Sequence, residues 1–131
     1  MWHLSGGKDI EFVGEDTKVY WSHAVPIFPL KARDFCTVKH IKRLKDGTSV
    51  VVQRATDHPA APITPDYVRG SIILGASIIE PVEHDPKKCL VTMITQLDPG
   101  GFTPAVIVNQ VCTSGPIGFF KGLELAAMKL K

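Results

Sequence analysis

The sequence predicts an α+β fold in which a run of strands is followed by one long C-terminal helix. Segments rich in β-branched and aromatic residues recur between residues 10 and 97, separated by short stretches of Gly, Pro and Asp. After residue 102 the apolar residues take up a helical spacing. Because the strands come first and the helix last, without alternation, the pattern is not that of a parallel α/β fold.

The composition is typical of one folded domain and excludes several classes of function. The 131 residues are 44% hydrophobic and 21% charged, and a net charge of +2 is too small to indicate a nucleic-acid partner. No apolar run approaches the roughly 20 residues of a membrane span, and no targeting segment is visible, so we expect a cytoplasmic location. Cys36, Cys89 and Cys112 lie far apart and indicate reduced thiols, not a disulfide framework or a zinc site. Neither a metal ion nor another cofactor is expected.

The first strands surround an unusual loop. Residues 10–13 form a short apolar segment, residues 15–16 a turn and residues 17–23 a strand. Residues 24–32 contain two prolines, which remove ladder donors and predict a loop. This loop is unusually apolar, so we expect it to cover another part of the molecule or to insert into something.

The remaining strands are predicted at 34–44, 49–56, 67–79 and 89–97. Asp46-Gly47 favours a tight hairpin turn between the first two of them. Residues 57–65 are proline-rich and form a loop, and residues 84–88 form a polar turn. Gly70 and Gly75 mark places where a curved sheet could bend or bulge.

The helix is predicted to begin at a proline. Thr103 is a suitable N-cap and Pro104 suits the first helical position. Val108 and Val111 fall on one face of this helix. Pro116 lies inside the pattern and is expected to kink the helix.

Short motifs occur in a particular order over about residues 10–128. They are Thr17-Lys18-Val19-Tyr20, Arg33-Asp34-Phe35, Asp46-Gly47, Asp57-His58-Pro59, Tyr67-Val68-Arg69-Gly70, Ile79-Glu80-Pro81, the run Asp98-Pro99-Gly100-Gly101-Phe102-Thr103-Pro104 and Val108-Asn109-Gln110. No single motif is decisive. In order and spacing together, the chain resembles a START domain, a lipid-binding and lipid-transfer fold.

The resemblance implies a helix-grip fold, in which a curved antiparallel sheet is gripped by the C-terminal helix. Residues 1–131 would be a single lipid-binding domain that lacks the family's N-terminal elements, because Trp2 resembles the tryptophan that precedes the family's middle strands. A missing N-terminal segment or a partner chain, as in a homodimer, would then supply the absent wall of the cavity.

The resemblance also places a basic residue inside the cavity four positions after Phe35, which is Lys39 here. Strand alternation then assigns further residues to the same face. The expected lipid-binding residues are Ser22, Phe35, Thr37, Lys39, Ile41, Val51, Gln53, Val91, Met93, Thr95, Val108 and Val111. Lys39 and Gln53 would meet the polar end of a lipid, and Asp57 is a candidate partner for Lys39. Equally, Lys39 could point to solvent as most lysines do, because a one-residue shift of register reverses the face.

The expected function is binding of one sterol, phospholipid or sphingolipid molecule without chemistry, for intracellular lipid transfer or sensing. The helix and the 24–32 loop would act as the gate, with transient membrane contact. One alternative is a non-catalytic regulatory or interaction module, and a second is a helix-grip hydrolase or cyclase. Cys36 and His40 share a strand face, but no oxyanion-type glycine turn accompanies them, so structural roles are favoured. Arg33 and Asp34 are expected to fix the entry of their strand and not to contact ligand.

Overall fold

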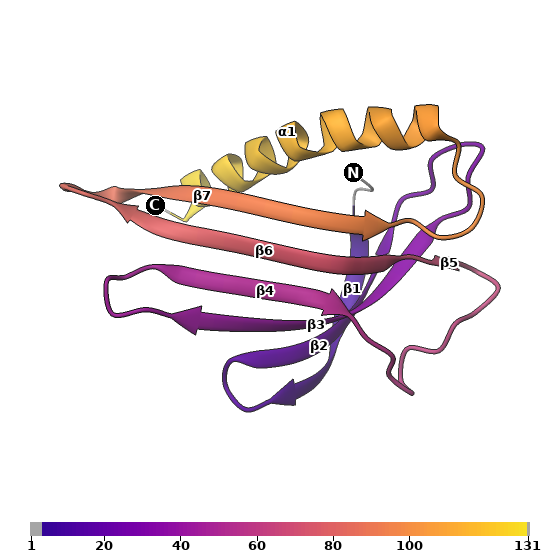
Figure 1. The fold of residues 1–131 in the computed structure, drawn as a ribbon, viewed down its shortest axis with the longest axis horizontal. Coiled ribbons are helices and arrows are strands. Elements are labelled where there is room, and N and C mark those ends of the chain that lie inside the picture. The colour runs from indigo at the N-terminus through magenta and orange to yellow at the C-terminus, as the bar shows by residue number, and fades with distance from the viewer. Residues whose placement is uncertain (1–3, 131) are drawn as a thin grey trace.

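The computed structural model describes residues 4–130 and contains a curved, mostly antiparallel sheet with one long helix. The elements are β1 (Leu4–Val13), β2 (Thr17–Ala24), β3 (Arg33–Arg43), β4 (Ser49–Ala55), β5 (Val68–Arg69), β6 (Ser71–Val82), β7 (Asp85–Asp98) and α1 (Ala105–Lys129). The sheet has the order β1-β2-β3-β4-β6-β7, and the short β5 pairs with β3 in parallel. Figure 1 shows α1 running along the sheet beside β7. The predicted α+β helix-grip class is confirmed.

β1 begins at Leu4, six residues before the apolar segment predicted there. The prediction was wrong because Gly6 and Gly7 weaken a strand pattern. In the structure these glycines permit close approach to β2. A Cβ atom at Gly7 would lie 2.5 Å from the carbonyl oxygen of Trp21, and one at Gly6 would lie 2.6 Å from the ring of His23.

The predicted 67–79 strand is divided at Gly70 into β5 and β6. Gly70 lies against Phe35, whose ring occupies the place that a Cβ atom would need. The predicted polar turn is also shorter, because β7 already begins at Asp85. His84 turns the chain with a φ of 64°, so β6 and β7 form one long hairpin.

The helix begins one residue later than predicted. Pro104 is the N-cap, and no side chain caps the helix. The Thr103 hydroxyl donates instead to the carbonyl oxygen of Gly100 at 3.1 Å, and it accepts from Arg33 Nη2 at 3.1 Å. The helix continues through Pro116 to Lys129.

Two small apolar clusters hold the elements together. In one, Ala24 and Leu30 are buried against partly buried residues of the loop, of β7 and of the first half of α1, namely Ile27, Leu97, Ile107 and Val111. In the other, Val19, Cys36 and Ala61 pack on the opposite sheet face, beneath the loop that follows β4. The helix is therefore anchored near its N-terminal end, and most of the sheet face below it remains available for a cavity.

Candidate functional site

A cavity of about 440 Å³ lies between the sheet and α1. Its walls come from five strands and one helix. They are Tyr20 and Ser22 from β2, Phe35 and Lys39 from β3, Val51 and Gln53 from β4, Ile72, Gly75 and Ser77 from β6, Met93, Thr95 and Leu97 from β7, and Gly115 and Phe119 from α1. Most of these groups are apolar, and the polar ones are concentrated on β2, β3 and β4.

The structure brings most of the expected lipid-binding residues together here. Ser22, Phe35, Lys39, Val51, Gln53, Met93 and Thr95 line the cavity. Thr37 lies on the same face of β3 and is fully buried. Ile41 lines an adjoining pocket of about 240 Å³, which also includes Lys39 and Val51.

Three expected residues lie elsewhere. Val111 packs in the cluster of Ala24 and Leu30 at the helix anchor. Val91 and Val108 are half-buried and are not among the residues that line the cavity.

Several lining residues were not predicted, although the sequence carried a signal for some of them. Tyr20 is two residues from Ser22 on the same strand, so alternation alone would have placed it on the cavity face. Gly115 and Phe119 extend the face of Val108 and Val111 by further helical turns. The residues of β6 had no such signal, because a bulge between Ile72 and Leu74 interrupts the alternation.

Four polar residues form what we call the polar floor of the cavity: Tyr20, Thr37, Lys39 and Gln53. The Tyr20 hydroxyl donates to Gln53 Oε1 at 2.8 Å, which links β2 to β4 across β3. The Lys39 ammonium lies 4.8 Å from the centroid of the Tyr20 ring, a cation–π distance. The Thr37 hydroxyl is fully buried beside Tyr20, and its hydrogen bonding to the phenol acts, against the larger effect of burial, to lower the pKa of Tyr20.

Burial governs the electrostatics of the polar floor. It lowers the pKa of Lys39, and the neighbouring charge of Lys18 lowers it further, while Asp9 acts in the opposite direction. Burial also raises the pKa of Tyr20. Asp57, the carboxylate considered as a partner for Lys39, is exposed, and its charge acts on Cys36 and Arg69 instead. The expected Lys39–Asp57 pair is therefore wrong.

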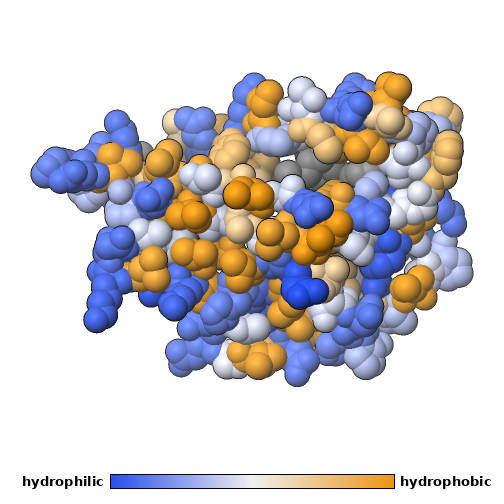
Figure 2. All heavy atoms as spheres, in the orientation of Figure 1, coloured by the Kyte–Doolittle hydropathy of each residue, from blue (hydrophilic) through white to orange (hydrophobic). Residues whose placement is uncertain are grey.

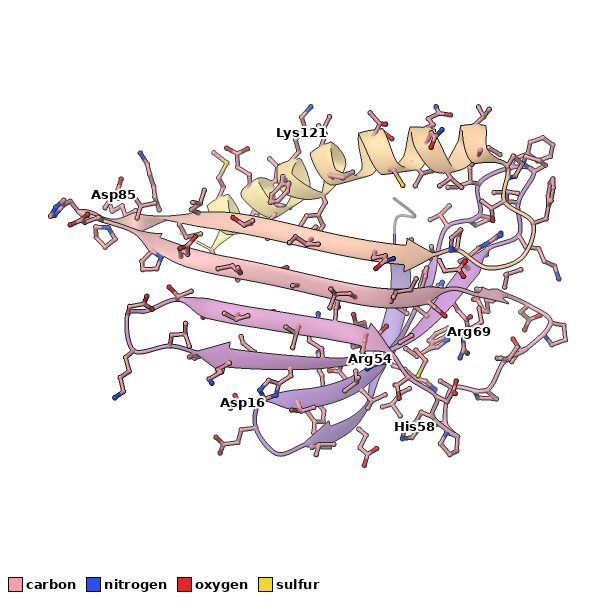
Figure 3. All side chains as sticks on the ribbon, viewed as in Figure 1. Asp16, Arg54, His58, Arg69, Asp85 and Lys121 are labelled. Atoms are coloured by element: carbon pink, nitrogen blue, oxygen red, sulfur yellow. The ribbon has the colours of Figure 1, made fainter. Side chains whose placement is uncertain are left out.

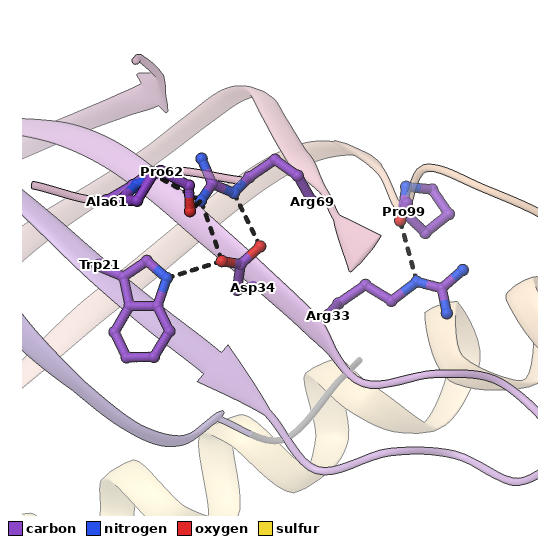
Figure 4. A network of polar contacts seen from close by, with 7 residues as sticks. All are labelled: Trp21, Arg33, Asp34, Ala61, Pro62, Arg69 and Pro99. Atoms are coloured by element: carbon purple, nitrogen blue, oxygen red, sulfur yellow. Dashed lines mark hydrogen bonds and ion pairs between the residues drawn. The ribbon is translucent and has the colours of Figure 1, made fainter. Parts of the chain in front are cut away.

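A second polar network lies outside the cavity, where β3 begins (Figure 4). Asp34 accepts from Trp21 Nε1 at 2.8 Å and from Arg69 Nε at 2.8 Å. Arg69 also donates to the carbonyl oxygens of Ala61 and Pro62. Figure 3 shows Arg69 and His58 at the same end of the sheet and Asp85 at the far end of the β6–β7 hairpin. The network ties β2, β3, β5 and the preceding loop together.

Arg33 makes the corresponding connection to the helix. Its guanidinium donates to the carbonyl oxygens of Lys31, Pro99 and Gly100 at 2.6, 3.1 and 2.9 Å. It also donates to the Thr103 hydroxyl. Arg33 thus joins the start of β3 to the turn that leads into α1, as expected of a residue that fixes the strand entry.

Comparisons with known proteins agree with this geometry. The family model described as START domain matches residues 4–131. StAR-related lipid transfer protein 5 of Bos taurus is 29% identical over 100 residues, which cover 76% of this chain and 47% of that protein. The mitochondrial steroidogenic acute regulatory protein of Danio rerio is 27% identical over 119 residues, which cover 89% of this chain and 41% of that protein. The chain thus spans less than half the length of these relatives.

Solved structures show the same fold. Human StAR-related lipid transfer protein 5 matches with a TM-score of 0.88 at 24% identity, over 98% of this chain and 62% of that one. Human STARD10 matches with a TM-score of 0.86 at 24% identity, over 97% of this chain and 51% of that one. Because the family model covers almost the whole sequence, this chain belongs to the START domain family.

Proposed function

We propose that the chain binds one lipid molecule in the cavity between the sheet and α1, for intracellular lipid transfer or sensing in the cytoplasm. START domains are lipid-binding and lipid-transfer domains, and sterols, phospholipids and sphingolipids are the candidate classes. The observation that carries the proposal is the cavity itself, which has apolar walls and a small set of fixed polar groups. Its volume of about 440 Å³ lies within the roughly 300–1,000 Å³ typical of small-molecule sites.

We propose that residues 1–131 act as one domain, which binds the lipid without altering it chemically. Cys36 is buried on the sheet face opposite the cavity, and burial raises the pKa of its thiol, which disfavours the reactive thiolate. His40 is exposed, and its Nδ1 lies 2.7 Å from the Thr17 hydroxyl. Neither residue lines the cavity. A regulatory module and a helix-grip enzyme are the alternatives that the experiment below distinguishes.

The helix and the 24–32 loop are proposed as the gate. Apolar contacts hold α1 to the rest of the protein near Ile107 and Val111, whereas Leu125 and Met128 near its other end are largely exposed. Phe28 on the loop is 95% exposed and Phe102 before the helix is 82% exposed, which suits transient membrane contact. Among the described residues, no helix is both long and apolar enough to cross a membrane.

The direct test is lipid uptake from vesicles. The chain is incubated with liposomes of mixed lipids, re-isolated and extracted, and the lipids are identified by mass spectrometry. We expect one lipid class above background, chemically unaltered. Recovery of no lipid would contradict binding and favour a regulatory module, and recovery of an altered lipid would favour the enzyme.

Two neighbouring substitutions on β6 provide a matched pair. Ser77 lines the cavity, and Ile78 points to the opposite face of the sheet. Ser77→Trp should fill the cavity and abolish most lipid recovery, whereas Ile78→Trp should retain it. Equal recovery by both variants would place the lipid elsewhere.

A further inference from the structure

The outer face of the sheet, opposite the cavity, carries a regular grid of side chains. Alternation fixes this face, because Ser77 and Met93 line the cavity and their neighbours along β6 and β7 point away from it. Two rows cross β3, β4, β6 and β7 in turn, namely His40–Val52–Ala76–Ile94 and Lys42–Val50–Ile78–Thr92. We call six apolar residues of this face the outer apolar patch, and all but Ala76 are substantially exposed: Val52, Leu74, Ala76, Ile78, Leu90 and Ile94.

Basic side chains border this patch along one side. Lys42 lies directly opposite Val50 in the pairing of β3 with β4, and Arg54 lies on the same face of β4. Both are exposed, and neither forms an ion pair with any residue that the structure describes. The exposed carboxylates that β3, β4, β6 and β7 carry on this face are those of Glu80 and Asp98, which lie at opposite ends of the β6–β7 pair. The border beside β3 is therefore positively charged.

The dimensions of the patch suit one α-helix. Neighbouring strands lie about 4.8 Å apart, so the apolar width from β4 to β7 is roughly 10 Å, close to the diameter of a helix with its side chains. From Leu74 to Glu80, the partner of Leu90, the patch extends about 20 Å along β6, the length of a helix of roughly 13 residues. An apolar sheet face is commonly buried by packing against a helix.

We propose that the outer apolar patch is a docking surface for an amphipathic α-helix of a partner protein, with acidic side chains along the flank that faces β3. The aliphatic side chains of that helix pack across β4, β6 and β7, and its carboxylates meet Lys42 and Arg54, which gives the two surfaces complementary charge. The patch and the cavity lie on opposite faces of the sheet, so the partner and a lipid can be bound together.

A second copy of this chain and a membrane fit the surface less well. α1 is the only helix of the described residues, and its charged side chains are Lys121, Glu124 and Lys129, which would bring mainly like charge to Lys42 and Arg54. The exposed aromatic residues suited to membrane contact belong to the 24–32 loop and to the turn before α1, and the outer apolar patch contains none.

The test measures binding of synthetic helical peptides to the whole chain by fluorescence anisotropy. Three peptides of about 18 residues, roughly 27 Å long as helices, share one stripe of leucines, and their flanking positions carry glutamates, glutamines or lysines. We expect the glutamate peptide to bind at least about tenfold more tightly than the lysine peptide, with the glutamine peptide between them. Equal affinities, or no binding of the glutamate peptide, would overturn the proposal.

Reversal of charge locates the contact. In the double variant Lys42→Glu with Arg54→Glu, the lysine peptide should bind more tightly than the glutamate peptide. The double variant Lys121→Glu with Lys129→Glu makes the same change of charge on α1 and should keep the original order of affinities. If the two double variants behave alike, net charge and not this surface governs binding, and the proposal is wrong.

The apolar contact is tested at Ile94. Ile94→Gln should weaken binding of the glutamate peptide about tenfold or more, while lipid recovery from vesicles stays that of the native chain, because Ile94 points away from the cavity. Leu125→Gln, at an exposed position on α1, is the matched control and should change neither. Undiminished peptide binding by a folded Ile94→Gln chain, as judged by circular dichroism, would place the helix elsewhere and contradict the proposal.

The other occupants give results of their own. Vesicles of anionic phospholipid should retain the Lys42→Glu, Arg54→Glu chain on sedimentation at least as well as the Lys121→Glu, Lys129→Glu chain. A selective loss in the first variant would make this face a membrane contact and overturn the proposal. A dimer that depends on Ile94 and that the glutamate peptide cannot dissociate would identify a second copy as the occupant, with the same consequence.

Discussion

Lys39 is a charged side chain that lines the cavity, and its position has a cost in stability. Its ammonium is partly desolvated and has no paired carboxylate among the described residues, so its charge is a cost to the unliganded protein. We therefore predict that Lys39→Met raises the free energy of unfolding by about 1 kcal/mol, as replacement of buried charge by an apolar side chain often does. Urea denaturation measures the change, and Lys42→Met should leave the stability unaltered.

The pH dependence of this effect has a definite sign. Because the folded-state pKa of Lys39 lies below its ordinary value of 10.5, the unfolded chain binds more protons between those two values. The stability of the native chain relative to Lys39→Met should therefore rise as the pH increases through this window. If the difference in stability between the native chain and Lys39→Met stays constant up to pH 10.5, Lys39 is solvated in the folded protein.

Asp34 is also a buried charged residue, but unlike Lys39 it has an ion-pair partner and should stabilise the fold. Its side chain is 3% exposed and is paired with Arg69, which is 14% exposed. We predict that Asp34→Asn lowers the free energy of unfolding by about 3 kcal/mol, since it leaves the largely buried Arg69 charge with carbonyl acceptors but without a carboxylate. Asp16→Asn is the matched control: its pair with Arg43 is solvent-exposed, so the loss should stay below about 1 kcal/mol. Equal losses in the two variants would contradict this assignment.

At the level of residues, the sequence could predict the cavity face but not the contacts within it. The resemblance and strand alternation together placed Lys39 and Gln53 correctly on the cavity face. They could not show that Tyr20 would bridge to Gln53 across β3 and present its ring to Lys39, because such contacts depend on side-chain conformation. The Asp57 pairing was wrong for a related reason. β4 ends at Ala55, so alternation no longer describes residue 57.

At the level of elements, the middle strands and the helix followed directly from the sequence. β2, β3 and β4 match their predicted ranges within a residue at each end, because their β-branched patterns are bounded by clear turn signals. β1 was largely missed, since Gly6 and Gly7 are explained only by the close approach of β2. The division at Gly70 likewise depends on the ring of Phe35, which lies far away in sequence.

The attachment of α1 to the sheet yields a prediction at this scale. Arg33 holds the turn before the helix through the carbonyl oxygens of Pro99 and Gly100. Arg33→Met would leave these groups without that donor, so we expect faster amide hydrogen exchange in the first turns of α1 than in the native chain. Arg54→Met, at an exposed position on β4, is the control and should not change the exchange. Equal acceleration throughout β2 and β3 would indicate general destabilisation instead of release of the helix.

For the molecule as a whole, the sheet face opposite the cavity is notably apolar. Val52, Ala76 and Ile94 are consecutive partners across β4, β6 and β7, and they alternate with residues that line the cavity. Ile78 lies beside them, and all but Ala76 are substantially exposed. Figure 2 shows apolar side chains among polar ones over the strands. A contiguous patch of this kind commonly marks an interaction site or a tendency to aggregate.

We therefore predict that the chain on its own self-associates or has low solubility. Sedimentation velocity should show dimers or larger species at micromolar concentration, and a dye that reports apolar surface should bind. Ile94→Lys places a charge in the centre of this patch and should shift the chain toward monomer, whereas Leu125→Lys, at an exposed position on α1, should have less effect. Since β7 is also an edge of the sheet, strand pairing offers a second route to association. That route should persist in Ile94→Lys, and a stable native monomer that binds no dye would refute both.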